Sequence, residues 1–351
     1  MNKQRIHWLD VAKGLMIVGM VLNHVPNYSA RVGNNLDLFP WHLFGGFYGV
    51  FTMQAFFILT GMTSNFYDNW KTFIKKQIKS LILPYISFTL LTKLIGILFF
   101  QEGLFYEVGG ESYFFLVESY WFLTALFVSK LMIYFTLKIC KKDYQAWLIV
   151  FSIMFIGFFI TYYYRDMPEP SHYKNFFHYR NGLCMTPFVY IGIWLNKAQI
   201  SKKIMLICSC IYVCLYCVTT VGGYVGYDIQ YISPPSYTHN LILETGTNIL
   251  GLIPSFLVYC ILGTILIIYL SKIINQSKLL ELFGRHTLSI YCIHFVVMQL
   301  VIQETSRYLV PITSFTSFLF FFIVSILTLG MSILISIVLE HKPLSFLLGK
   351  F

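Results

Sequence analysis

Residues 8–24 read WLDVAKGLMIVGMVLNH, a largely apolar stretch of nearly the length that a helix needs to cross a bilayer. Three ionisable side chains interrupt it, namely Asp10, Lys13 and His24. At about 100° per residue, Lys13 and His24 lie three turns apart on one helical face, separated by about 16 Å along the axis. Asp10 precedes Lys13 by three residues and can pair with it. The stretch therefore predicts a transmembrane helix with polar groups along one face.

The composition of the whole chain also indicates a membrane protein. Of 351 residues, 57% are hydrophobic and 11% are charged, whereas a soluble domain carries roughly 25% charged residues. An ordinary soluble enzyme is therefore excluded, and we predict an all-α polytopic bundle of about ten transmembrane helices in which residues 1–351 form one transmembrane domain. The ten apolar runs are centred on 8–27, 43–65, 80–101, 119–138, 145–164, 182–196, 203–221, 246–270, 286–304 and 313–340.

The 25 Lys and Arg residues divide unevenly between the alternating loops of this bundle. Seventeen fall on the side that holds both termini and five on the other, while Lys13, Lys93 and Lys130 lie within spans. Cytoplasmic loops carry the excess of basic residues, so both termini are predicted to be cytoplasmic. The net charge of +10 is thus a topology signal rather than the basic stripe of a nucleic-acid-binding protein. No His/Cys cluster has metal-ligand spacing, so neither nucleic acid nor metal is an expected partner.

Ionisable groups within a span are costly, at about 2.5–3.5 kcal/mol each, and are functional candidates for that reason. A cation at the cytoplasmic end of the first span could hold the anionic head of a cofactor, and an imidazole three turns deeper could serve a reactive group on an extended arm. Histidine suits general-base work because burial favours its neutral, proton-accepting form. The alternative is structural: Lys13 snorkels to the interface, Asp10 neutralises it, and His24 only hydrogen-bonds a neighbouring helix.

Six short segments follow one another along the chain: Leu9-Asp10-Val-Ala-Lys13-Gly14 through His24, Phe56-Phe57-Ile-Leu-Thr60-Gly61, Lys75-Lys76-Gln77-Ile78-Lys79 leading to Pro84-Tyr85, Trp121-Phe122-Leu123-x-x-Leu126-Phe127, Arg180 to Pro187-Phe188 and Gly192, and Gly284 through Thr287-Leu288-Ser289-Ile290-Tyr291 to His294. Together they resemble the membrane acyltransferase-3 family, whose members O-acylate sugars of surface and secreted glycans. The resemblance covers almost the whole chain.

By this resemblance His24 is the catalytic histidine, and Lys13 stands at the position of a family arginine. The basic stretch after the second span then helps to bind acyl-CoA at the cytoplasmic face, which marks Lys75, Lys76 and Lys79 as cofactor-binding residues together with Lys13. Lys13 lacks the bidentate fork of a guanidinium, and Gln77 and Ser80 stand where arginines are usual. The alternative for the three lysines is the positive-inside signal alone.

Four further residues are predicted to bind the acceptor substrate. Arg180 opens the sixth span at the outer face beside His178, Trp121 belongs to the fourth-span segment, and His294 lies inside the ninth span. Arg180 could instead be an interfacial anchor. His294 could instead be a buried histidine that only donates to a backbone carbonyl.

These features predict an integral membrane O-acyltransferase, with O-acetylation as the favoured case. It would move an acyl group from cytoplasmic acyl-CoA, a co-substrate rather than a tightly bound cofactor, to a hydroxyl of a cell-surface or extracellular glycan, with His24 as general base and Asp10 and Lys13 beside it. Direct transfer and a transient acyl-enzyme both fit the residues. The alternatives are an exporter of polysaccharide or lipid-linked glycan and a ligand-sensing membrane module. The expected location is multi-pass in a cell membrane, with the bacterial cytoplasmic membrane preferred.

Overall fold

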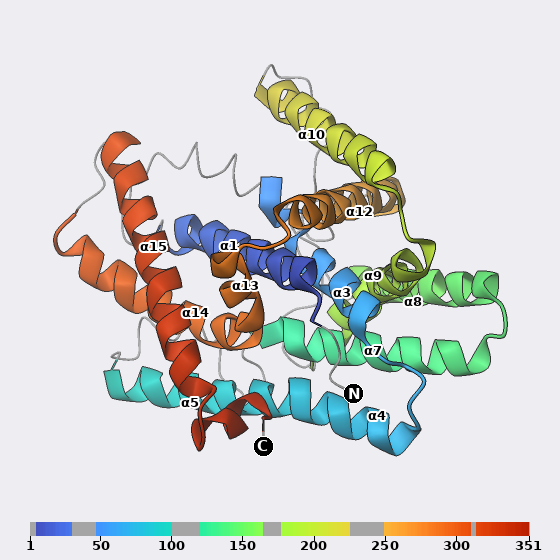
Figure 1. Ribbon diagram of the computed structural model, residues 1–351, viewed down its shortest axis with the longest axis horizontal. Coiled ribbons are helices and arrows are strands. Elements are labelled where there is room, and N and C mark those ends of the chain that lie inside the picture. Colours follow the sequence, from blue (N-terminus) through green and yellow to red (C-terminus); the bar gives the residue numbers. More distant parts are fainter. Residues whose placement is uncertain are drawn as a thin grey trace. The chain divides into compact units, whose positions relative to one another are not determined.

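The computed structural model describes residues 5–29, 47–99, 120–163, 177–224, 249–309 and 314–350. Within these ranges every regular element is a helix (Figure 1). In chain order the elements are α1 (His7–Ser29), α3 (Thr52–Thr63), α4 (Trp70–Gln77), η1 (Ile78–Ile82), α5 (Leu83–Phe99), α7 (Trp121–Ile139), α8 (Asp143–Tyr163), α9 (Tyr179–Ala198), α10 (Lys202–Tyr224), α12 (Ile249–Ile274), α13 (Lys278–Arg285), α14 (Thr287–Ser306), α15 (Ser314–Leu339) and η4 (Leu344–Leu348). The predicted all-α class is confirmed.

Seven helical segments of the described chain are long and apolar enough to cross a membrane. They are His7–Val25, Trp70–Ile95, Trp121–Ile139, Asp143–Thr161, Phe256–Ile274, Thr287–Ser306 and Phe315–Leu339. The remaining three predicted spans also coincide with helices, namely the shorter apolar segment Phe47–Thr63, α9 and α10. The chain is therefore a multi-pass helical protein, while ten spans and cytoplasmic termini stay predictions.

Two short helices lie where the sequence analysis expected loops. Asn69 caps α4 by accepting a hydrogen bond from the backbone N–H of Thr72 at 2.9 Å, and α4 continues through the π-helical turn η1 into α5. Ser277 caps α13 in the same manner, at 3.4 Å from the N–H of Leu280. Such side-chain caps satisfy N–H groups that the first turn of a helix leaves unpaired. The basic stretch of residues 71–79 is therefore helical, and α13 is an additional packing element.

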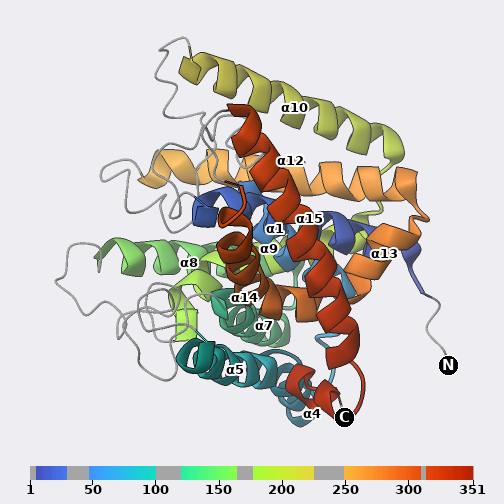
Figure 2. The same ribbon diagram turned by 90° about the vertical axis from the view of Figure 1, so that its left-hand side faces the viewer.

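The chain divides into two compact units, of which the first comprises Met1–Phe56, Ile200–Leu241 and Thr247–Val338. Here α1 packs against α12, α13 and α14, and α10 packs on α12, its neighbour in both views (Figure 1, Figure 2). A buried apolar cluster joins residues of α1, α14 and α15, namely Val25, Phe295, Val297, Met298, Val301, Ile302, Phe320, Phe321 and Val324. The first span is thus surrounded by helices that are remote from it in the sequence.

The second unit comprises Phe57–Gln199, Ile242–Gly246 and Leu339–Phe351. In it α9 packs on both α7 and α8, and η4 packs on α5. Gly61 and Gly192 face each other across α3 and α9, where a Cβ on either would overlap a backbone carbonyl oxygen of the other helix. Ser129 of α7 donates to the carbonyl of Gly182 in α9 at 2.6 Å. Small residues and interhelical hydroxyl bonds hold these helices together.

Candidate active site

Two histidines from distant parts of the sequence meet in the first unit. The ring centroids of His24 on α1 and His294 on α14 are 5.6 Å apart, with the ring planes inclined by 34°. Phe295 packs on both rings, at 4.9 Å from His24 and 4.0 Å from His294. His24 is half-buried, whereas the side chain of His294 is fully buried. The structure therefore pairs the predicted catalytic histidine with a residue that was predicted to bind substrate.

The hydrogen bonds of His294 identify which of its ring nitrogens carries a proton. Its Nδ1 lies 2.7 Å from the carbonyl oxygen of Tyr291 and 3.2 Å from that of Ile290. Carbonyl oxygens only accept, so Nδ1 is the N–H donor and Nε2 holds the lone pair of the neutral ring. Nε2 is buried and has no hydrogen-bond partner among the described residues. In the sequence analysis, donation to a backbone carbonyl was the alternative to a functional role for His294. This donation uses only Nδ1, so Nε2 remains available.

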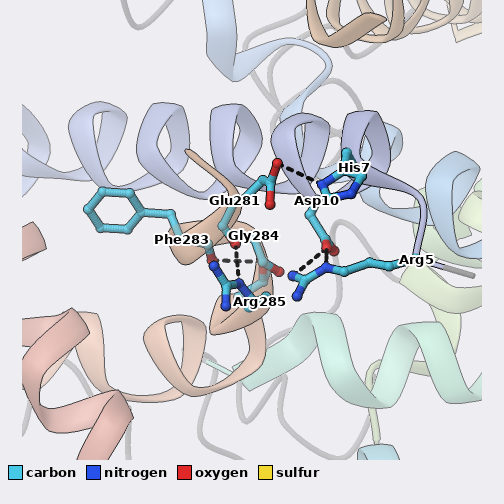
Figure 3. Close-up of polar contacts among 8 residues, drawn as sticks. Arg5, His7, Asp10, Glu281, Phe283, Gly284 and Arg285 are labelled. Carbon is cyan, nitrogen blue, oxygen red and sulfur yellow. Dashed lines mark hydrogen bonds and ion pairs between the residues drawn. The ribbon is translucent and has the colours of Figure 1, made fainter. Parts of the chain in front are cut away.

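At the other end of α1 the carboxylate of Asp10 is held by Arg5. The Nε and Nη2 atoms of Arg5 donate to Oδ2 of Asp10 at 2.8 and 2.7 Å (Figure 3). The hydrogen-bonded partner of Asp10 is therefore Arg5, whose guanidinium offers two parallel donors to the carboxylate, while Lys13 interacts with Asp10 only through the electrostatic attraction between the two charges. Lys13 is half-buried one turn further along. The uninterrupted α1 confirms that Lys13 and His24 belong to one continuous helix.

The short helix α13 packs closely against this end of α1. A Cβ on Gly14 would overlap the backbone carbonyl of Leu280, and a Cβ on Gly284 would overlap that of Asp10. Nδ1 of His7 lies 3.0 Å from Oε1 of Glu281, whose side chain is 11% exposed (Figure 3). Two glycines and an ion pair thus fix α13 on the polar end of α1.

The three lysines predicted to bind a cofactor lie on α4 and η1, in the second unit. All three are exposed. The Nζ of Lys76 pairs with Oδ2 of Asp68 at 2.5 Å, so one charge of the three is already partly neutralised. Lys75 and Lys79 are one helical turn apart and can face one ligand.

The remaining predicted substrate residues gather at one end of α7 and α9, also in the second unit. Trp121 begins α7, and His178 and Arg180 flank the start of α9. A Cβ on Gly182 would meet the carbonyl of Ala125 at 2.8 Å, so the first turns of the two helices are neighbours. His178 is buried and has a left-handed backbone with φ of 48°, a costly conformation for a residue with a side chain.

The acyltransferase-domain family matches residues 6–337 of this chain. The chain belongs to the membrane acyltransferase-3 family. Comparison of this acyltransferase with curated proteins and with solved structures finds no match. Among its described residues no group of three or more His, Cys, Asp or Glu side chains is arranged to hold a metal ion.

Some features of this acyltransferase were missed by the sequence analysis. Arg5 was counted only as a topology residue, and the His7–Glu281 pair joins positions that no local pattern relates. Gly14 and Gly284 were quoted within motifs without a role. A signal for them did exist, because small residues within apolar or amphipathic segments mark close helix contacts.

Proposed function

We propose that this protein is an O-acetyltransferase that moves an acetyl group from cytoplasmic acetyl-CoA to a hydroxyl of a cell-surface glycan, with His24 as general base. The observation that supports it best is the His24–His294 pair, with 5.6 Å between ring centroids, in which His24 lies on the helix that also carries Lys13. An ionisable pair within a membrane-spanning bundle is a functional candidate by default. Family membership supports acyl transfer.

In the proposed reaction, neutral His24 takes the proton of the acceptor hydroxyl as its oxygen attacks the thioester carbonyl. The carbonyl becomes a tetrahedral oxyanion, which collapses as the C–S bond breaks. The leaving thiolate takes a proton from the His24 imidazolium, so the histidine ends neutral and the products are the acetyl ester and CoA. Such general-base catalysis contributes typically 10²–10⁴-fold to the rate. His294 packs beside His24 and restricts its orientation.

The other predicted residues take the two substrates. The lysines of α4 and η1 attract the anionic nucleotide of acetyl-CoA, because phosphates bind ammonium groups well, and Lys13 stays a predicted cofactor-binding residue. Trp121, His178 and Arg180 bind the acceptor sugar, since an indole face stacks on sugar rings and the polar groups reach hydroxyls. The cytoplasmic membrane of a bacterium is the proposed location. Family membership gives no support to the exporter alternative.

The test uses sealed vesicles that contain wild-type or His24→Ala protein, supplied with radiolabelled acetyl-CoA and candidate glycans. We expect His24→Ala to transfer label about 10²–10⁴-fold more slowly. His294→Gln, which keeps a polar side chain but alters the packing against His24, should lower kcat with little change in KM for acetyl-CoA. His341→Ala, at an exposed histidine of the second unit, is the matched control and should retain activity.

Equal transfer by wild-type and His24→Ala protein contradicts His24 as the base. No transfer by the wild type together with intact glycan export would favour the exporter.

A further inference from the structure

Lys130 is a buried cation midway along a membrane-spanning helix. Its side chain is 8% exposed, and its Cα lies nine residues, about 14 Å, from the end of α7 at Ile139. In the described part of the chain its ammonium makes no hydrogen bond or ion pair. A charge in this position is costly unless an opposite charge or polar groups compensate it. Neither the sequence analysis nor the proposed function assigns it a role.

A second buried polar group lies on α4. Gln77 is 5% exposed, and its Oε1 has no hydrogen-bond partner within the residues that the structure describes. Gln77 ends α4 directly before the five-residue π-helical turn η1. Such wide turns within α-helices occur frequently at functional sites. The two ends of an amide exchange by rotation about χ3, so the buried end can offer either a carbonyl or an NH₂ group.

The packing of α4, η1 and α5 on α7 places these two residues at the same level. Phe73 stacks on Tyr134 with centroids 4.4 Å apart, and further along, the hydroxyls of Thr92 and Tyr120 are 2.7 Å apart. Residue numbers rise along one segment as they fall along the other, so the two run antiparallel.

Gln77 follows Phe73 by one turn, and Lys130 precedes Tyr134 by one turn. Both steps lead from the stack toward the Thr92–Tyr120 contact. Residues four apart share a helical face. Gln77 and Lys130 therefore lie on the facing sides of the two helices, one turn beyond the stack.

We propose that Lys130 and Gln77 form a binding site for a phosphate group. The ammonium supplies charge and the amide supplies a neutral hydrogen bond, and together they are the complement that a phosphate oxygen requires. The exposed Lys75 and Lys79 on the same helical segment as Gln77 raise the local concentration of anions beside it.

The phosphate has two possible sources, the acyl-CoA of the proposed function and a phospholipid headgroup. Lys130 is buried within the protein, at 8% exposed, whereas the headgroup phosphates of a bilayer lie against the outer surface of a membrane protein. The acyl donor is therefore the favoured source, and in this respect the site rests on the proposed function.

The experiment measures the Kd of CoA, without an acetyl group, by calorimetry on purified protein in nanodiscs of zwitterionic phosphatidylcholine. Lys130→Met keeps the length of the side chain and removes its charge. We expect it to weaken CoA binding roughly 10- to 100-fold, the range of a lost charge-assisted contact. Lys130→Arg, which restores a cation, should bind within a few-fold of wild type. Gln77→Leu should lie between wild type and Lys130→Met.

Lys138→Met is the matched control, since it removes the same charge from an exposed position two turns away on α7. An unchanged Kd in Lys130→Met, or an equal loss in Lys138→Met, overturns the site. A Lys130→Arg variant that is monodisperse yet binds as weakly as Lys130→Met also overturns it, because the charge would then not matter.

Two further comparisons distinguish a failure of the phosphate site from a failure of the proposed function, and CoA from phospholipid as the ligand. The binding assay needs no acyl transfer, so wild-type protein that binds CoA in a Lys130-dependent manner but transfers no acetyl group supports the site and refutes the proposed function. If the wild type transfers acetyl groups while Lys130→Met binds CoA with unchanged affinity, the proposed function is supported and the phosphate site is refuted. Nanodiscs with anionic phospholipid identify the source: a CoA affinity equal to that in phosphatidylcholine supports the acyl donor, whereas a headgroup that displaces CoA from wild type but not from Lys130→Met supports the phosphate site and overturns the acyl donor as its occupant in the membrane.

Discussion

Two helix contacts, one in each unit, bring polar groups together in different ways. Where α13 meets α1, each acidic group is paired: Asp10 with Arg5, and Glu281 with His7. Where α4 meets α7, Lys130 is as deeply buried as Glu281, at 8% exposed each, and no acidic side chain of the described chain compensates it. Paired charges stabilise a fixed arrangement, whereas an uncompensated buried charge favours a site that a ligand completes. The first contact is therefore structural, and the second is suited to binding.

Of the changes considered, Gly284→Ala should disrupt the contact between α13 and α1 most. In Gly284→Ala the new Cβ overlaps the backbone carbonyl of Asp10, so α13 must move away from α1. Overpacking of this kind costs roughly 1–3 kcal/mol. We expect a lower thermal stability in detergent, followed by the temperature at which the monodisperse peak is half lost, and a loss of acetyl transfer because the polar end of α1 shifts.

Gly330→Ala is its matched control. Gly330 lies in the middle of α15, and a Cβ there meets no atom within 4 Å. Alanine is also the better helix former, so this variant should be as stable as wild type or slightly more so. Similar losses in both variants would show that glycine-to-alanine changes are harmful throughout this bundle, and the close contact at Gly284 would then explain nothing.

The α4–α7 contact is tested next by removing two of the exposed lysines of α4 and η1. Lys76→Ala combined with Lys79→Ala should raise the KM for acetyl-CoA roughly three- to tenfold with kcat unchanged, since exposed charges contribute about 0.2–1 kcal/mol each and Lys76 is shared with Asp68. The measurement is initial rate against acetyl-CoA concentration. The double variant Lys141→Ala, Lys142→Ala removes two exposed charges from the neighbouring α7–α8 turn. An equal KM in all three proteins would reduce the lysines of α4 to topology signals.

The smallest effect is expected at Glu281. Glu281→Gln retains the shape of the side chain and a hydrogen-bond acceptor for His7, and the His7 side chain is 46% exposed. Partly exposed ion pairs contribute about 0–1 kcal/mol. Thermal stability should therefore stay close to wild type, and transfer within about twofold. A loss as large as that of Gly284→Ala would mean that the ion pair, not the glycine contact, holds α13 on α1.

The sequence analysis predicted the spans better than the elements between them. Each predicted span coincides with a described helix, because about 20 apolar residues are a strong local signal. The eight-residue helices α4 and α13 were expected as loops. Helices of two turns owe most of their stability to tertiary packing and to caps such as Asn69 and Ser277, so their own residues predict them poorly.

In the candidate site, too, local relations were predicted and contacts outside a regular helix were not. His24 and Lys13 share a face of one helix, a relation that the 3.6-residue period predicts and the uninterrupted α1 confirms. The contact of Asp10 with Arg5 was not predicted, although Lys13 also interacts electrostatically with Asp10, as expected. Arg5 precedes the helix, where no periodic rule describes the direction of the chain, and the guanidinium reaches back to the carboxylate.

The sequence by itself determined that this chain is a helical membrane protein of the acyltransferase-3 family, with Lys13 and His24 on one face of its first span. Apolar length, loop charge and motif order are local properties, so they can be read along the chain. Only the tertiary structure decided that His294 lies beside His24, and that Lys130 and Gln77 lie level on facing helices. These relations depend on how helices remote in sequence pack, and that packing is the joint result of many small contacts and close glycine approaches.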